Sequence, residues 1–235
     1  MPEAGRRPWV VSQHVPYEGP GLVARCLEDA GWPVEVVRPD RGERFPDVAT
    51  LGGLVVMGGP MGVGDGDLHP WLGSERDLLA AAVDAGLPVL GVCLGAQQLA
   101  AALGGTVTTG PGPELGVGTV TLTPAGRVDP VFGPEYGGLS ATDVPCVHWY
   151  QDTFSLPGGA VHLAATRTFH HQAFRVGRRA YGLQFHVEVD AALAEAWRPH
   201  LPGGMELDGP SVARIATTGR RLLQRFVALA DGDPG

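Results

Sequence analysis

The chain has 235 residues, 44% of them hydrophobic and 18% charged, which is enough for one large domain with a buried core. Its formal net charge is −8 and its basic residues form no stripe, so we expect no nucleic-acid partner. Nowhere are 18 consecutive residues apolar, and the first residues lack the apolar stretch of a signal peptide. The sequence therefore predicts a cytoplasmic protein with no membrane partner. All 17 basic residues are arginines, which excludes a Schiff-base lysine or a P-loop lysine within these residues.

The first half of the chain alternates between short apolar runs and helical patterns. Strands are predicted at residues 9–12, 34–37, 54–57 and 89–92, and helices at residues 21–30, 71–85 and 94–103. Continuous apolar strands that alternate with helices form parallel sheets covered on both faces. The pattern therefore predicts an α/β fold of three layers around a mostly parallel sheet.

The second half has a different pattern, with short strands separated by turns. These strands are predicted at residues 117–123, 146–149, 161–166, 173–176 and 181–185, and we expect them to extend the sheet, partly as antiparallel strands. Helices are predicted at residues 191–200 and 212–230, with a linker at residues 202–210. We therefore divide the chain into a domain at residues 1–200 and an appended linker and C-terminal helix at residues 201–235.

Cys93 is a candidate nucleophile because of its position. A predicted buried strand runs directly into a helix at this residue, and Gly91 and Gly95 lie two residues to either side. This is the pattern of a nucleophile elbow, in which a tight turn projects the side chain and small neighbours avoid clashes. The free N–H groups of the helix favour the thiolate, and the N–H of Leu94 is placed to bind an oxyanion.

A histidine and a glutamate lie two positions apart at the end of the last predicted strand. Side chains of a strand alternate between its faces, so His186 and Glu188 project from the same face. An acid beside a histidine can fix its tautomer and stabilise the imidazolium that forms when the ring takes a thiol proton. Together with Cys93, these two residues form a candidate Cys-His-Glu triad.

Other reactive residues receive structural interpretations. Cys26 and Cys146 are expected to be small core residues with free thiols, as in a reducing cytosol. Cys146 and His148 have no second pair of ligands at a suitable spacing, so no metal is expected. The glycine-rich residues 58–67 lack the lysine of a phosphate loop and are interpreted as a sharp loop that brings an N–H close to a substrate.

Five blocks in this order resemble the class I (triad) glutamine amidotransferase family, and among its members the stand-alone relatives of the GMP synthase glutaminase domain. The blocks lie at residues 58–61, 91–97, 115–116, 152–157 and 184–188. The resemblance implies a flavodoxin-like sheet and hydrolysis of the glutamine side-chain amide through a Cys thioester to glutamate and ammonia, without a cofactor. Because the chain has no ATP-binding domain of its own, it also implies a separate synthetase partner that accepts the ammonia.

The resemblance also implies a role for each residue of the candidate site. The Cys93 thiolate would attack the amide carbon, His186 would protonate the departing ammonia and activate water to cleave the thioester, and Glu188 would orient His186. The N–H groups that form the oxyanion hole would be those of Gly59 and Leu94. The pocket for L-glutamine would include Gln97 and the backbone around Gln151.

Two departures from the family pattern leave an alternative open. Val187 stands where the family usually has proline, which still allows the same-face geometry. Tyr150 and Gln151 stand where the family often has His-Gly, and Gln151 brings a side chain to the edge of the implied pocket. The alternative function is a stand-alone γ-glutamyl hydrolase or transferase that acts on another γ-glutamyl compound with the same triad. A non-catalytic binding protein with this fold ranks last, because all three triad residues are present.

Overall fold

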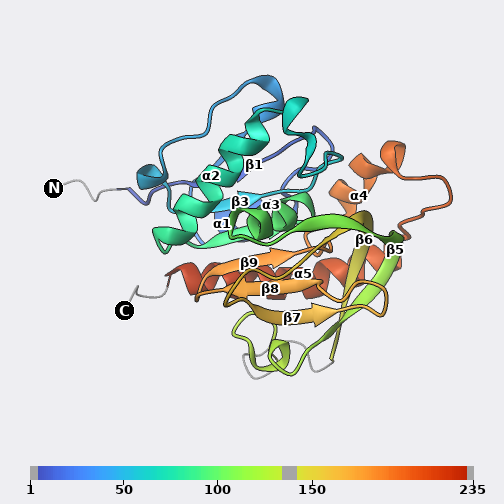
Figure 1. The fold of residues 1–235 in the computed structure, drawn as a ribbon. Helices are drawn as coiled ribbons and strands as arrows, with labels where there is room; N and C mark the ends of the chain where they lie inside the picture. The colour runs from blue at the N-terminus through green and yellow to red at the C-terminus, as the bar shows by residue number, and fades with distance from the viewer. Residues whose placement is uncertain (1–4, 134–141, 232–235) are drawn as a thin grey trace.

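The computed structural model describes residues 5–133 and 142–231. In this part of the chain, nine strands form one sheet in the order β2-β1-β3-β4-β9-β8-β7-β5-β6 (Figure 1). In chain order the strands are β1 (Trp9–Ser12), β2 (Val34–Val37), β3 (Gly53–Val56), β4 (Val89–Val92), β5 (Val107–Leu122), β6 (Asp143–Phe154), β7 (Val161–Ala165), β8 (Ala173–Val176) and β9 (Ala180–Leu183). The helices are α1 (Leu22–Asp29), α2 (Trp71–Asp84), α3 (Leu94–Ala102), α4 (Ala191–Trp197) and α5 (Gly209–Asp231).

The sheet has a parallel half and an antiparallel half. Strands β2, β1, β3, β4 and β9 are neighbours and run parallel. Strands β8, β7, β5 and β6 continue the sheet with antiparallel pairing. The order of the parallel half is that of a flavodoxin-like doubly wound sheet, in which ligands bind beyond the carboxyl ends of the strands. This confirms the predicted α/β fold with an antiparallel extension.

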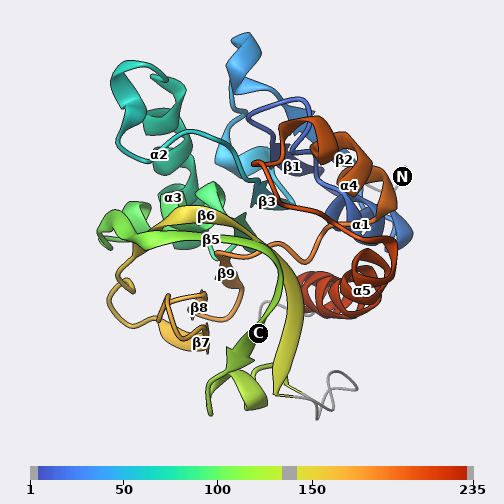
Figure 2. The ribbon, with the colours of Figure 1, turned by 90° about the vertical axis from the view of Figure 1, so that its right-hand side faces the viewer.

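Helices cover both faces of the parallel half, which makes three layers. Figure 2 shows α2 and α3 on one side of the sheet and α1 and α5 on the other. Alternate strand residues separate accordingly, because side chains of a strand point to opposite faces. Val10 and Leu54 belong to the apolar cluster under α2 and α3, whereas Val11 and Val55 belong to the cluster under α1 and α5.

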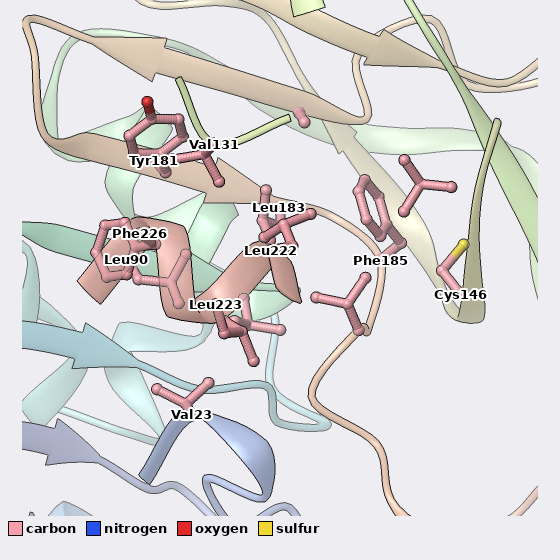
Figure 3. Packing of buried hydrophobic residues seen from close by; sticks show 14 of the residues in the cluster. Val23, Leu90, Val131, Cys146, Tyr181, Leu183, Phe185, Leu222, Leu223 and Phe226 are labelled. Carbon is pink, nitrogen blue, oxygen red and sulfur yellow. The ribbon is translucent and has the colours of Figure 1, made fainter. Parts of the chain in front are cut away.

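Helix α5 is part of the main core. Its buried residues Leu222, Leu223 and Phe226 lie among Val23 of α1 and the strand residues Leu90 and Tyr181 (Figure 3). The division of the chain near residue 200 stays a prediction, but the helix after it packs centrally rather than peripherally. None of the described helices is both long and apolar enough to cross a membrane.

Three strands differ from the sequence prediction. Strands β5 and β6 are much longer than the predicted segments 117–123 and 146–149 and pair as a long ribbon. The first half of β5 contains Gly110, Pro111, Gly112 and Pro113, residues that are rare in strands, and the register shifts across them. Strand β9 ends at Leu183, earlier than predicted.

The packing of α3 on β3 gives a test of the fold. A Cβ atom at Gly95 would overlap the carbonyl oxygen of Val56. We therefore expect Gly95→Ala to lower the free energy of unfolding in urea by about 3 kcal/mol. A Cβ atom at Gly73 in α2 would have no neighbouring atom within 4 Å, so Gly73→Ala is the matched control and should be neutral or slightly stabilising. Equal losses in both variants would contradict the close approach of α3 to β3.

Candidate active site

The candidate site lies at the carboxyl edge of the parallel strands. Cys93 follows β4, the segment with His186 follows β9, Gly58 follows β3, and His14 follows β1. These four strands are neighbours in the sheet, so segments far apart in the sequence meet at one place.

Cys93 has a strained backbone conformation at the end of β4. Its φ is +53°, and it is the only non-glycine residue with a positive φ among those the structure describes. Its N–H donates to the Leu183 carbonyl at 2.7 Å, and a Cβ at Gly91 would overlap the Gly95 carbonyl. The chain therefore turns sharply from strand to helix with no room for side chains beside the cysteine, as the elbow pattern predicts. Strain of this kind is concentrated at functional sites.

His186 and Glu188 form a buried pair. His186 Nδ1 lies 2.7 Å from Glu188 Oε1, and each side chain is only 1% exposed. The predicted reason for their proximity was partly wrong, because β9 ends three residues before His186. An extended segment holds them instead, with His186 and Val147 of β6 exchanging N–H···O bonds of 2.9 and 3.0 Å. This bridge preserves the alternation that places both side chains on one side.

The imidazole of His186 and the side chain of Cys93 converge on Gly58. A Cβ atom at Gly58 would lie 3.2 Å from His186 Cε1 and 3.5 Å from Cys93 Cβ. Burial alone would lower the pKa of His186, but the charge of Glu188 and the nearby sulfur raise it well above its ordinary value. The ring nitrogen Nε2 is buried and makes no hydrogen bond of normal geometry to any described residue. It is therefore free to exchange a proton with a group beside it.

A cavity of about 520 Å³ opens beside the cysteine. All of the residues proposed from the sequence for the oxyanion hole and the substrate pocket line it: Gly59, Leu94, Gln97 and Gln151. The side-chain amide of Gln97 donates to Gln184 Oε1 at 3.2 Å, and the amide of Gln184 donates to Cys93 Sγ at 3.8 Å. Gln97 thus reaches the cysteine through Gln184, a link that the sequence did not indicate.

The remaining candidates take structural places. Cys146 and His148 belong to a buried hydrogen-bond network in which His148 Nδ1 and Glu114 both contact the hydroxyl of Tyr150, at 2.7 and 2.5 Å. Within the described ranges, no group of three or more His, Cys, Asp or Glu side chains is arranged to hold a metal ion. Asp65 accepts a hydrogen bond from the N–H of Gly62 and so stabilises the glycine-rich loop.

Three buried titratable residues near the site were missed by the sequence analysis. His14 and Glu75 form a fully buried pair with His14 Nε2 and Glu75 Oε1 2.8 Å apart. Glu18 is 6% exposed and lies against Gly58 and within the electrostatic reach of His186. One signal was available for Glu75, because it stands at an inward position of α2, three residues after Leu72 and four before Leu79.

Glu18 gives a prediction about pH. Burial raises the pKa of its carboxyl from 4.5 to about 7, although His186 and His14 oppose the shift. The fold therefore favours the protonated acid, and stability present below pH 4.5 is lost as the pH rises through 7, by about 3 kcal/mol. Glu18→Gln keeps the neutral form, so at pH 8 it should be more stable than the parent by about this amount, with no difference near pH 4.5. Urea unfolding at both pH values measures this, with the exposed Glu28→Gln as control. A constant difference between Glu18→Gln and the parent would contradict it.

Comparisons with known proteins agree with this geometry. The family model "Glutamine amidotransferase class-I" matches residues 21–196. The chain is 31% identical over 191 residues to the glutamine amidotransferase-like protein YfeJ of Salmonella typhimurium, a match that covers 80% of this chain and 78% of that protein. It is 33% identical over 175 residues to a separate subunit of the glutamine-hydrolyzing GMP synthase of Natronomonas pharaonis, covering 72% and 81%.

Longer relatives and solved structures give the same result. The match to the GMP synthase of Aeropyrum pernix, at 34% identity, covers 72% of this chain but only 30% of that longer protein. A glutamine amidotransferase structure from Methylobacillus flagellatus superposes with a TM-score of 0.81 at 28% identity, covering 97% of this chain and 98% of that one. One from Thermotoga maritima gives 0.83 at 25% identity, covering 97% and 99%. The chain belongs to the class I glutamine amidotransferase family.

Proposed function

We propose that this protein hydrolyses the side-chain amide of L-glutamine to glutamate and ammonia and passes the ammonia to a separate synthetase. The observation that carries the proposal is the convergence of Cys93, at a strained elbow, with the buried His186–Glu188 pair beside a cavity. Nucleophile, base and orienting acid in this arrangement suit acyl transfer through a covalent intermediate.

In the first half of the reaction, His186 Nε2 takes the proton of the Cys93 thiol. The sulfur attacks the amide carbon and forms a tetrahedral intermediate with a negative oxygen. The N–H groups of Gly59 and Leu94 bind that oxygen, and neither amide donates to another backbone group among the described residues. His186 then returns the proton to the amide nitrogen, the C–N bond breaks, and ammonia leaves a γ-glutamyl thioester on Cys93.

In the second half, the same residues act on water. His186 takes a proton from a water molecule, and the hydroxide adds to the thioester carbon. The C–S bond breaks, glutamate leaves, and the proton returns from His186 to the sulfur. Glu188 holds the imidazole through Nδ1 in both halves and stabilises its charged form, which agrees with the raised pKa of His186.

The synthetase partner is part of the proposal because of the relatives. One similar protein is named as one subunit of a GMP synthase, and the longer GMP synthases match this chain over only 30% of their length. The chain itself contains no lysine for a nucleotide-binding P-loop. Ammonia produced in this cavity would therefore be used by another polypeptide.

Product analysis tests the proposal. The purified protein is incubated with L-glutamine, with asparagine, and with a panel of other γ-glutamyl amides, and glutamate and ammonia are quantified. We expect equal amounts of both products from glutamine, none from asparagine, and a faster reaction when the synthetase partner is added. Turnover of other γ-glutamyl compounds without turnover of glutamine would contradict the proposal and favour a γ-glutamyl hydrolase or transferase.

A further inference from the structure

A closed polar cluster lies behind the loop that follows β3. The carboxylate of Glu75, on α2, accepts hydrogen bonds from Ser12 Oγ at 2.5 Å and from His14 Nε2 at 2.8 Å, and Gln98 Nε2 lies 3.4 Å from its other oxygen. All four side chains are completely buried. Burying such groups is unfavourable unless they are well bonded, and the proposed reaction uses none of them as acid, base or nucleophile.

The second ring nitrogen of His14 connects this cluster to the loop. His14 Nδ1 lies 2.9 Å from the carbonyl oxygen of Gly58, and because a carbonyl can only accept, Nδ1 must donate. Nε2 donates to the Glu75 carboxylate, so the ring is a buried imidazolium. Burial alone would lower the pKa of His14, but Glu75 and the Gly58 carbonyl raise it above its ordinary value. Trp71 stacks on the ring with centroids 5.0 Å apart and fixes its plane.

The bond to His14 determines how the next N–H is directed. In a trans peptide, the carbonyl oxygen and the following N–H point to opposite sides, and the described residues contain no cis peptide. With the Gly58 carbonyl aimed at His14, the N–H of Gly59 is turned away from His14. On its other side, Gly59 lines the cavity together with Cys93 and Leu94.

The loop needs such an anchor because glycine stands on both sides of this peptide. A Cβ at Gly58 would overlap the Glu18 carboxylate, and a Cβ at Gly59 would lie 3.1 Å from His14 Nδ1, so larger residues do not fit. Two consecutive glycines, however, offer little resistance to rotation of the peptide between them. A rotated peptide would present its carbonyl oxygen to the cavity in place of its N–H.

We propose that His14, held by Glu75, is a positioning residue that fixes the Gly58–Gly59 peptide with its N–H toward the cavity, so that the oxyanion hole is formed before substrate binds. This inference rests on the proposed function, because it assigns the hole to the amide hydrolysis at Cys93. It gives the buried cluster a purpose that packing alone does not supply.

Three variants test the inference. Glu75→Gln serves as the background, because it removes the buried charge that a His14 substitution would leave unpaired. In that background, His14→Asn keeps an amide donor near the place of Nδ1, whereas His14→Phe keeps the ring against Trp71 without a donor. Each protein is assayed for glutamine hydrolysis and for alkylation of Cys93 by iodoacetamide, which reacts at a saturated carbon and forms no oxyanion.

We expect the Phe variant to have a kcat about 10²–10³-fold below that of the Asn variant, with a smaller change in KM. Alkylation of Cys93 should proceed at the same rate in both. Equal kcat values would overturn the inference, and so would alkylation that slows in parallel with hydrolysis, because the defect would then lie in the nucleophile.

A crystal structure of the Phe variant gives a readout independent of turnover. The inference expects the Gly58–Gly59 peptide to rotate or to become disordered there and to keep its orientation in the Asn variant. An unchanged peptide in the Phe variant would overturn it. If the parent protein fails to hydrolyse glutamine, the proposed function fails, while the crystal structures still decide the role of His14.

Discussion

Replacement of Cys93 by alanine is expected to lower kcat for glutamine hydrolysis by at least about 10⁴-fold, because it removes the nucleophile of the proposed reaction. Neither of the other two cysteines can replace it. Burial raises the pKa of Cys26 to about 11 and that of Cys146 well above its ordinary value, so both remain protonated thiols away from the cavity. Steady-state ammonia release, measured at saturating glutamine, gives the result.

Two control variants separate chemistry from folding. Cys26→Ala removes a buried thiol from α1 and should retain kcat despite some loss of stability. Cys93→Gly should be as inactive as Cys93→Ala but should unfold at a higher temperature, because glycine tolerates the φ of +53° that alanine does not. A folded Cys93→Ala protein with more than about 1% of the parental kcat would contradict the role of the sulfur as nucleophile.

Replacement of His186 by asparagine should lower kcat by about 10³–10⁴-fold, because both proton transfers of the proposed reaction pass through this ring. The same variant should change the alkylation of Cys93 by iodoacetamide. In the parent, His186 can hold the thiol proton at neutral pH, since Glu188 and the sulfur raise its pKa. Without the ring, alkylation should need a higher pH, and its rate profile measures this directly.

His162→Asn is the matched control for this experiment. His162 lies on β7, where its Nε2 contacts the carbonyl oxygens of Ala164 and His170 and burial lowers its pKa. This variant should keep both the kcat and the alkylation profile of the parent. An unchanged alkylation profile in His186→Asn would show that another group accepts the thiol proton.

The parallel half of the fold and the residues of the candidate site could be predicted because their signals are local. Strands β1, β3 and β4 are short apolar runs, and a strand buried on both faces needs no more than that. The elbow at Cys93 is visible as a strand, a cysteine and a helix with glycines at fixed spacing. His186 and Glu188 are two residues apart, so any extended segment places them on one side.

Features that depend on distant partners could not be predicted in this way. Glu75 looks like a solvated helix residue until His14, 61 positions away, is placed beside it by the packing of α2 on the sheet. The antiparallel bridge that holds His186 beyond the end of β9 requires Val147 of β6. The first half of β5 contains glycine and proline and becomes a strand only because β6 pairs with it.

Covalent labelling tests the central claim most directly. The protein is treated with a glutamine analogue in which a chloromethyl ketone replaces the side-chain amide, and the product is analysed by intact mass and peptide mapping. We predict one added group per chain, located on Cys93, with labelling slowed by excess glutamine and no label on Cys26 or Cys146. Labelling at a different residue, or labelling that glutamine does not slow, would contradict the assignment of this cavity to glutamine and of Cys93 to the attack.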